Sequence, residues 1–67
     1  MQVGQRVEAV KMASDSFYKK VIGTVTKIEN GFVSIDADIV MSKWDDEYQK
    51  HPTFCSTAAR IENVVAL

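Results

Sequence analysis

Two pairs of residues in this sequence are of types that can perform chemistry. Asp36 and Asp38 place two carboxylates on one face of a strand, and such pairs can hold Mg²⁺ together with water molecules. His51 and Cys55 lie close in sequence, and a histidine can activate a cysteine as a nucleophile. The aspartates lack a third ligand, and the Cys–His pair lacks an orienting group and an oxyanion site. We expect no metal, no cofactor and no catalysis, with solvated aspartates and Cys55 as a small core residue.

Aromatic and acidic side chains are better candidates for function. The aromatic residues are too many for 67 residues to bury, and Trp and Tyr are enriched at the centres of protein interfaces. Three acids, Asp45 to Glu47, follow Trp44 directly, and an acidic rim steers a basic partner. We place Phe54 in the core. The predicted partner-binding residues are Phe17, Tyr18, Trp44, Asp45, Asp46 and Tyr48.

Nucleic-acid binding is the alternative to protein binding. The net charge of −1 provides no global attraction to nucleic acid. The first half of the chain nevertheless carries more basic than acidic residues. Its candidate phosphate-binding residues are Lys11, Lys19, Lys20 and Lys27.

Length and composition predict one domain over residues 1–67. A chain of this size buries about 60% of its unfolded surface, so a second copy or a partner could extend the thin core. The single cysteine and single histidine exclude an internal disulfide and a zinc site built from them, and the free thiol suits a reducing cytoplasm. No apolar run is long enough for a signal peptide or a membrane span.

The hydrophobic pattern predicts an all-β fold. Residues 5–11 and 20–29 have strand-like composition, and Gly23 marks a bend within the second of these runs. Asn30-Gly31 predicts a type I′ hairpin turn. The alternation from Phe32 to Met41 turns the odd-numbered residues toward the core, unless the strand kinks after Ala37. The predicted core consists of Val7, Ala9, Val25, Val33, Ile35, Ile61 and Val65.

The segment after this strand has helical features. Ser42 and Asp45 fit a capping box, and His51-Pro52 would end the helix. We expect a short helical turn within residues 43–50, or a loop that contains it. A short strand over 53–56, a tight helical turn over 57–60 and a last strand over 61–67 complete the chain.

Several short motifs in this order resemble those of SH3-like small barrels, in particular the KOW-type members and the small barrel protein of photosystem I. The resembling motifs are Gly4-Gln5-Arg6-Val7, Ile22-Gly23-Thr24-Val25, Ile28, Val33-Ser34-Ile35 and the tail from Ala59 to Val65. The resemblance implies a five-stranded SH3-like barrel. The acidic segment 42–51 departs from the KOW pattern, as does the lack of a basic cluster around the second strand. Thr53-Phe54-Cys55-Ser56 also lacks the Gln and Tyr of the Val-Gln-Ile-Tyr strand of type II dihydrofolate reductases.

Three functions are therefore in contention: a protein-binding module or accessory subunit, a KOW-like nucleic-acid-binding barrel, and a catalytic subunit whose site forms at an oligomer interface. The near-neutral charge and the missing catalytic groups favour the first. The small size also suits a phage- or plasmid-encoded effector that binds a host protein with a basic surface.

Overall fold

The computed structural model describes residues 1–13 and 17–67, so the middle of the predicted 12–18 loop lies outside the described residues. The all-β prediction is confirmed. The strands are β1 (Arg6–Val10), β2 (Tyr18–Glu29), β3 (Phe32–Ser42), β4 (Gln49–Arg60) and β5 (Val64–Ala66), with one 3-10 turn, η1 (Ile61–Asn63). The described residues contain no helix that could cross a membrane.

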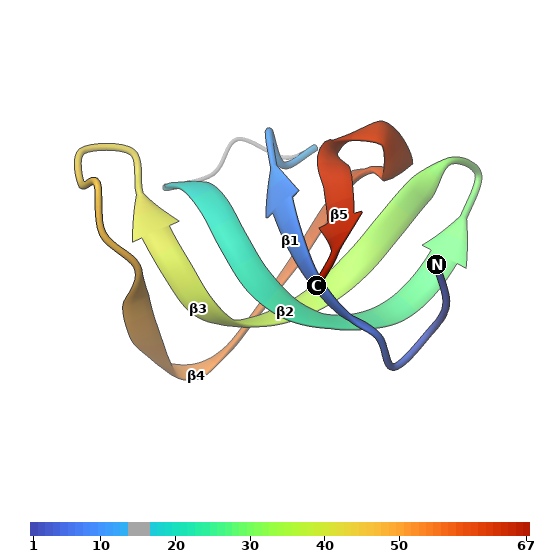
Figure 1. The fold of residues 1–67 in the computed structure, drawn as a ribbon, viewed down its shortest axis with the longest axis horizontal. Coiled ribbons are helices and arrows are strands. Elements are labelled where there is room, and N and C mark those ends of the chain that lie inside the picture. Colours follow the sequence, from blue (N-terminus) through green and yellow to red (C-terminus); the bar gives the residue numbers. More distant parts are fainter. Residues whose placement is uncertain (14–16) are drawn as a thin grey trace.

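All five strands belong to one antiparallel sheet in the order β4-β3-β2-β1-β5. The first four strands follow one another as a meander, and β5 returns to pair with β1. The long strands β2 and β3 bend, so that the sheet curls around its apolar side (Figure 1). This curled sheet is compatible with a barrel-like fold.

Gly23 lies at the bend of β2, as predicted. A Cβ atom added there would lie 2.2 Å from the carbonyl oxygen of Asp36 and 2.6 Å from the Cα atom of Ala37 on β3. The pairing of β2 with β3 shifts register between Ile22 and Gly23. Glycine is therefore required because the two backbones approach closely at the point where the sheet curls.

The β2–β3 turn has the backbone that its sequence predicts. Asn30 has φ = 53° and Gly31 has φ = 80°, and a type I′ turn requires positive φ at both positions. The turn aligns Glu29 with Phe32 and Ile28 with Val33, which turns Val33 and Ile35 toward the core.

Five of the seven predicted core residues are fully buried: Val7, Ala9, Val25, Val33 and Ile35. Ile61 and Val65 were wrongly placed in the core, since they are 43% and 62% exposed. Ile61 belongs to η1, so β5 begins three residues later than expected, at Val64. Val64 is buried, whereas Val65 pairs with Glu8 and faces outward.

The alternation along β3 changes face after Ala37. A register shift against β4 lies between Ala37 and Ile39, and beyond it Val40 is buried while Ile39 is half-buried. Uninterrupted alternation was therefore wrong for Ile39 and Val40, whereas the alternative of a kink after Ala37 was right, because an irregularity of one residue exchanges the two faces of a strand. Met41 is buried, as predicted.

The helical turn predicted within residues 43–50 is absent. Lys43 and Trp44 form a turn, the Asp45 amide donates to the Ser42 carbonyl (3.2 Å), and β4 already begins at Gln49. The Lys43 amide donates instead to the Phe17 carbonyl at 3.1 Å. The β3–β4 connection is thus anchored to a distant segment, and a helix this short is not stable alone.

β4 runs without a break through the predicted short strand over 53–56 and the predicted tight turn over 57–60, so that turn is absent. It passes through Pro52, which is tolerated because β4 is an edge strand of the sheet. Ile39 pairs with Lys50 and Ala37 with Cys55, so residues 51–54 bulge opposite Asp38. Phe54 lies in this bulge and is 67% exposed, so its placement in the core was wrong.

Candidate functional site

The segments that follow β1 and β3 meet at one end of the sheet. The Phe17 ring lies edge-on to Trp44 and to Tyr18, with centroid distances of 5.0 Å and 5.4 Å. The Lys43–Phe17 backbone hydrogen bond joins the two segments, and Lys19 pairs with Asp46 at 3.2 Å. Trp44 remains 75% exposed and Phe17 is also exposed. The result is an aromatic cluster of Phe17, Tyr18 and Trp44, joined by ring contacts and the Lys43–Phe17 backbone bond. The solvent-exposed Lys19–Asp46 pair adds little to it.

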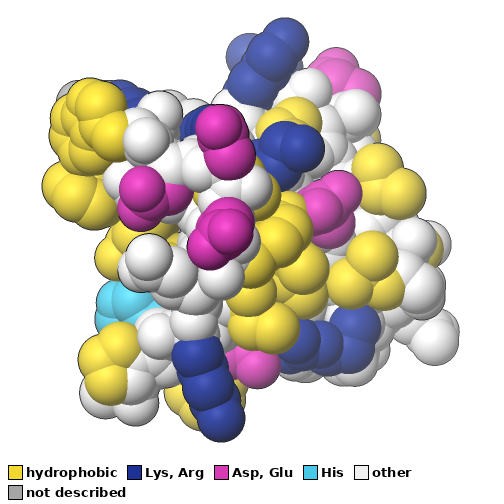
Figure 2. All heavy atoms as spheres, turned by 60° about the vertical axis from the view of Figure 1, so that its left-hand side comes forward, with side chains coloured by type: hydrophobic (Ala, Val, Ile, Leu, Met, Phe, Trp, Pro, Cys, Tyr) yellow, Lys and Arg dark blue, Asp and Glu magenta, His cyan; other side chains and the backbone are white. Residues whose placement is uncertain are grey.

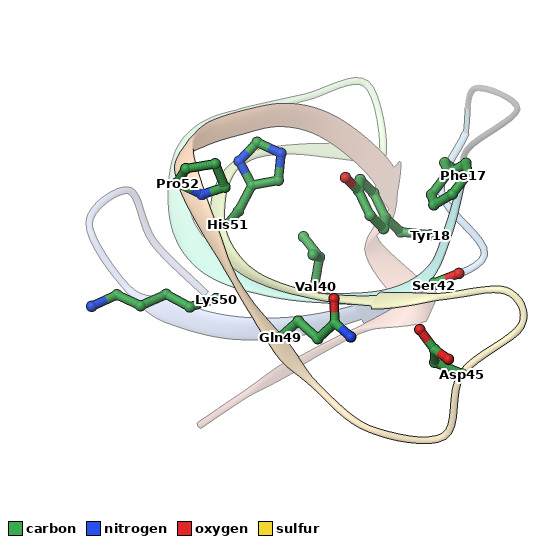
Figure 3. A pocket seen from close by; sticks show the side chains of 9 residues that line it. All are labelled: Phe17, Tyr18, Val40, Ser42, Asp45, Gln49, Lys50, His51 and Pro52. Carbon is green, nitrogen blue, oxygen red and sulfur yellow. The ribbon is translucent and has the colours of Figure 1, made fainter.

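A hollow of about 320 Å³ opens beside this cluster. Figure 3 shows Tyr18 and His51 on opposite sides of it, with Val40 between them at its floor. The Tyr18 and His51 rings are 6.1 Å apart, nearly perpendicular. The full lining is Phe17, Tyr18, Val40, Ser42, Asp45, Gln49, Lys50, His51 and Pro52.

The bulge in β4 determines the position of His51. Its Nδ1 atom accepts a hydrogen bond from the Thr53 amide at 3.3 Å and also lies against the Thr53 carbonyl oxygen. Cys55 is half-buried and packs against the core. The backbone of the bulge, and not the thiol, therefore orients the imidazole.

The two aspartates of β3 have separate partners. Asp36 accepts a hydrogen bond from the Ser56 hydroxyl at 3.2 Å. Asp38 accepts one from the Arg6 guanidinium at 2.8 Å, and this bond lowers the pKa of the Asp38 carboxyl. Among residues 1–13 and 17–67, no group of three His, Cys, Asp or Glu side chains is placed to hold a metal ion.

Tyr48 is turned away from the aromatic cluster. Its hydroxyl donates to the Glu8 carboxylate on β1, across the outer face of β3 and β2. Burial, followed by this hydrogen bond, raises the pKa of Tyr48 to about 12. Tyr48 thus fastens the β3–β4 connection to the sheet.

This contact predicts a pH-dependent contribution to stability. Because the pKa of Tyr48 rises from 10.0 to about 12 on folding, the folded protein keeps a proton that the unfolded chain releases. The contribution is complete below pH 10 and is lost as the pH rises toward 12. Denaturant titrations should show wild type more stable than Tyr48→Phe at neutral pH, with the difference shrinking above pH 10. A difference that stays constant with pH would contradict this assignment.

The predicted acidic residues divide between two environments. Asp45 lines the hollow, whereas Asp46 pairs with Lys19 and remains exposed, as does Glu47. Figure 2 shows acidic side chains beside hydrophobic ones on this side of the molecule. Acidic and aromatic groups therefore adjoin here, with Asp45 nearest the hollow.

Among the lysines of the nucleic-acid alternative, Lys27 lies apart from the other three. Lys19 pairs with Asp46, and Lys27 pairs with Glu29 at 3.2 Å. Lys27 lies seven residues beyond Lys20 on β2, which is about 23 Å of strand. Lys11 follows β1 directly, at the end where β2 begins.

Sequence reasoning missed most of the hollow. Val40, Gln49, His51 and Pro52 line it because β3 changes face after Ala37 and β4 bulges opposite Asp38. The His51-Pro52 pair marked this irregularity but was interpreted as the end of a helix. Comparison with protein-family models, curated proteins and solved structures found no match to the chain.

Proposed function

We propose that this chain is a non-catalytic protein-binding module built on an SH3-like barrel. The fold assignment is supported by the short motifs described above and by the curled five-stranded sheet in which Phe17, just before β2, meets Lys43, just after β3. The function rests on one observation: Trp44, the largest side chain of the protein, is 75% exposed and fixed against Phe17. An exposed aromatic side chain that is already ordered loses little entropy when a partner covers it.

The proposed partner carries a basic surface. Asp45 and Glu47 remain beside the aromatic cluster after Lys19 has paired with Asp46. Such a rim accelerates the encounter with a positively charged surface and orients it more than it adds affinity. A protein that itself binds nucleic acid would provide that surface, and this chain would then compete with the nucleic acid. The free Cys55 thiol supports action in a reducing cytoplasm, as for a phage- or plasmid-encoded effector with a host target.

Trp44→Ala should weaken partner binding by about 2 kcal/mol or more, because it removes the largest and most exposed side chain of the aromatic cluster. The experiment captures partners from a bacterial lysate after nuclease treatment, then measures the affinity of the purified partner. Phe54→Ala is the matched control, since Phe54 is also exposed and aromatic but lies in the β4 bulge. Asp45→Asn should mainly slow association and reduce its salt dependence.

Two results would contradict the proposal. If Trp44→Ala weakens binding no more than Phe54→Ala does, the aromatic cluster is not the centre of the interface. The nucleic-acid alternative would be favoured if nuclease treatment abolished partner capture and if the protein bound oligonucleotides in a salt-dependent way. Lys19→Ala and Lys20→Ala should then weaken that oligonucleotide binding.

A further inference from the structure

The hollow adjoins the proposed interface, because Phe17 lines the hollow and also contacts Trp44. Its volume of about 320 Å³ is at the lower end for ligand pockets, which suits one side chain better than a folded segment. Val40, nearly buried, provides an apolar floor, and the Tyr18 and His51 rings provide walls (Figure 3). An occupant must therefore be narrow, with an apolar stem over Val40 and a polar end near Asp45.

The charges around the hollow favour a cation. Asp45 and Lys50 are the charged residues of its lining. Figure 3 shows the Lys50 side chain extending away from the hollow. The Lys50 charge instead helps to lower the pKa of Asp38, which pairs with Arg6. Asp45 thus places a carboxylate at the hollow, beside polar groups of Ser42 and Gln49.

We infer that the hollow receives an arginine side chain of the partner. The alkyl stem would lie over Val40 against the Tyr18 ring, and the guanidinium would pair with Asp45 near Phe17. A planar guanidinium stacks on aromatic rings and pairs with a carboxylate through two hydrogen bonds, which an ammonium cannot do. This inference rests on the proposed function and adds to it the chemistry of the side chain that is recognised.

The test uses single-residue probes and does not require the partner to be identified. Nα-acetyl-arginine N-methylamide is titrated into the isotope-labelled protein, and amide chemical shifts are followed by NMR. We expect saturable shifts in the millimolar range at Tyr18, Val40, Asp45 and His51. The citrulline analogue has the same shape without the charge and should bind at least about fivefold more weakly, with the lysine analogue between the two.

Two variants separate a specific contact from general attraction by acidic residues. Asp45→Asn should weaken the binding of the arginine probe by about two- to fivefold. Asp46→Asn is the matched control and should leave the affinity unchanged, since Asp46 pairs with Lys19 and is not part of the lining. Both side chains are exposed, so neither substitution disturbs the core.

The inference is overturned if the arginine probe gives no saturable shifts, if citrulline binds equally well, or if Asp45→Asn and Asp46→Asn have the same effect. Equal binding of the lysine probe would overturn the preference for arginine. These failures are distinguishable from failure of the proposed function. If the probe does not bind but Trp44→Ala still removes partner binding, the interface stands and the hollow is not its arginine site.

Discussion

Ile35→Ala should lower the free energy of unfolding by about 2–5 kcal/mol. Ile35 is 1% exposed at the centre of β3 and is among the largest fully buried side chains. Alanine would leave a cavity that the paired strands on both sides cannot close. Because a domain of this size has a stability of only several kcal/mol, the variant would be partly unfolded at room temperature.

Denaturant titration followed by tryptophan fluorescence and circular dichroism measures this loss. Ile28→Ala is the matched control, because Ile28 is exposed near the end of β2 and its removal should cost well under half as much. Similar losses for the two variants would mean that β3 does not direct Ile35 into the core.

Gly23→Ala should destabilise the protein by about 3 kcal/mol or more, at the upper end of the range for overpacking. The added methyl group would meet the Asp36 carbonyl oxygen and the Ala37 Cα atom, and neither can rotate away as a flexible side chain would. Relief requires β2 and β3 to separate where the sheet curls, which also disturbs the pairing that orients Ile35.

Gly31→Ala separates this clash from the general effect of replacing glycine. Gly31 has φ = 80°, but an added Cβ atom meets nothing within 4 Å, so its cost should be about 1–2 kcal/mol from backbone strain. Equal denaturation midpoints for the two variants would show that the contact at Gly23 costs no more stability than replacing a glycine in an open turn.

The parts of the fold that were predictable are those determined by residues near in sequence. Asn30-Gly31 specifies its turn through its own backbone preferences, and the alternation up to Ala37 specifies which face of β3 is buried. Val65 was assigned to the wrong face because η1 lies four residues later than expected, and periodicity alone does not locate the start of a strand.

The candidate site was predictable in part. The aromatic residues were recognisable because they are more than a small core can bury. The acidic residues were recognisable as the run that follows Trp44. The hollow was not visible, because it depends on where β4 leaves its pairing with β3, between Lys50 and Cys55. The Ser42–Asp45 capping pattern favoured a helix, but the segment before β4 is too short for a stable helix and forms a turn, anchored by the Lys43–Phe17 backbone bond.

The bulge of β4 also limits how molecules of this protein can aggregate. A regular outer strand offers a row of free amide and carbonyl groups on which another chain can polymerise. Here Pro52 has no amide hydrogen, and residues 51–54 lie outside the pairing register with β3. An incoming strand would find two short docking segments in place of one long one. The irregularity that helps to form the hollow therefore also protects the sheet from growing into a fibril along this edge.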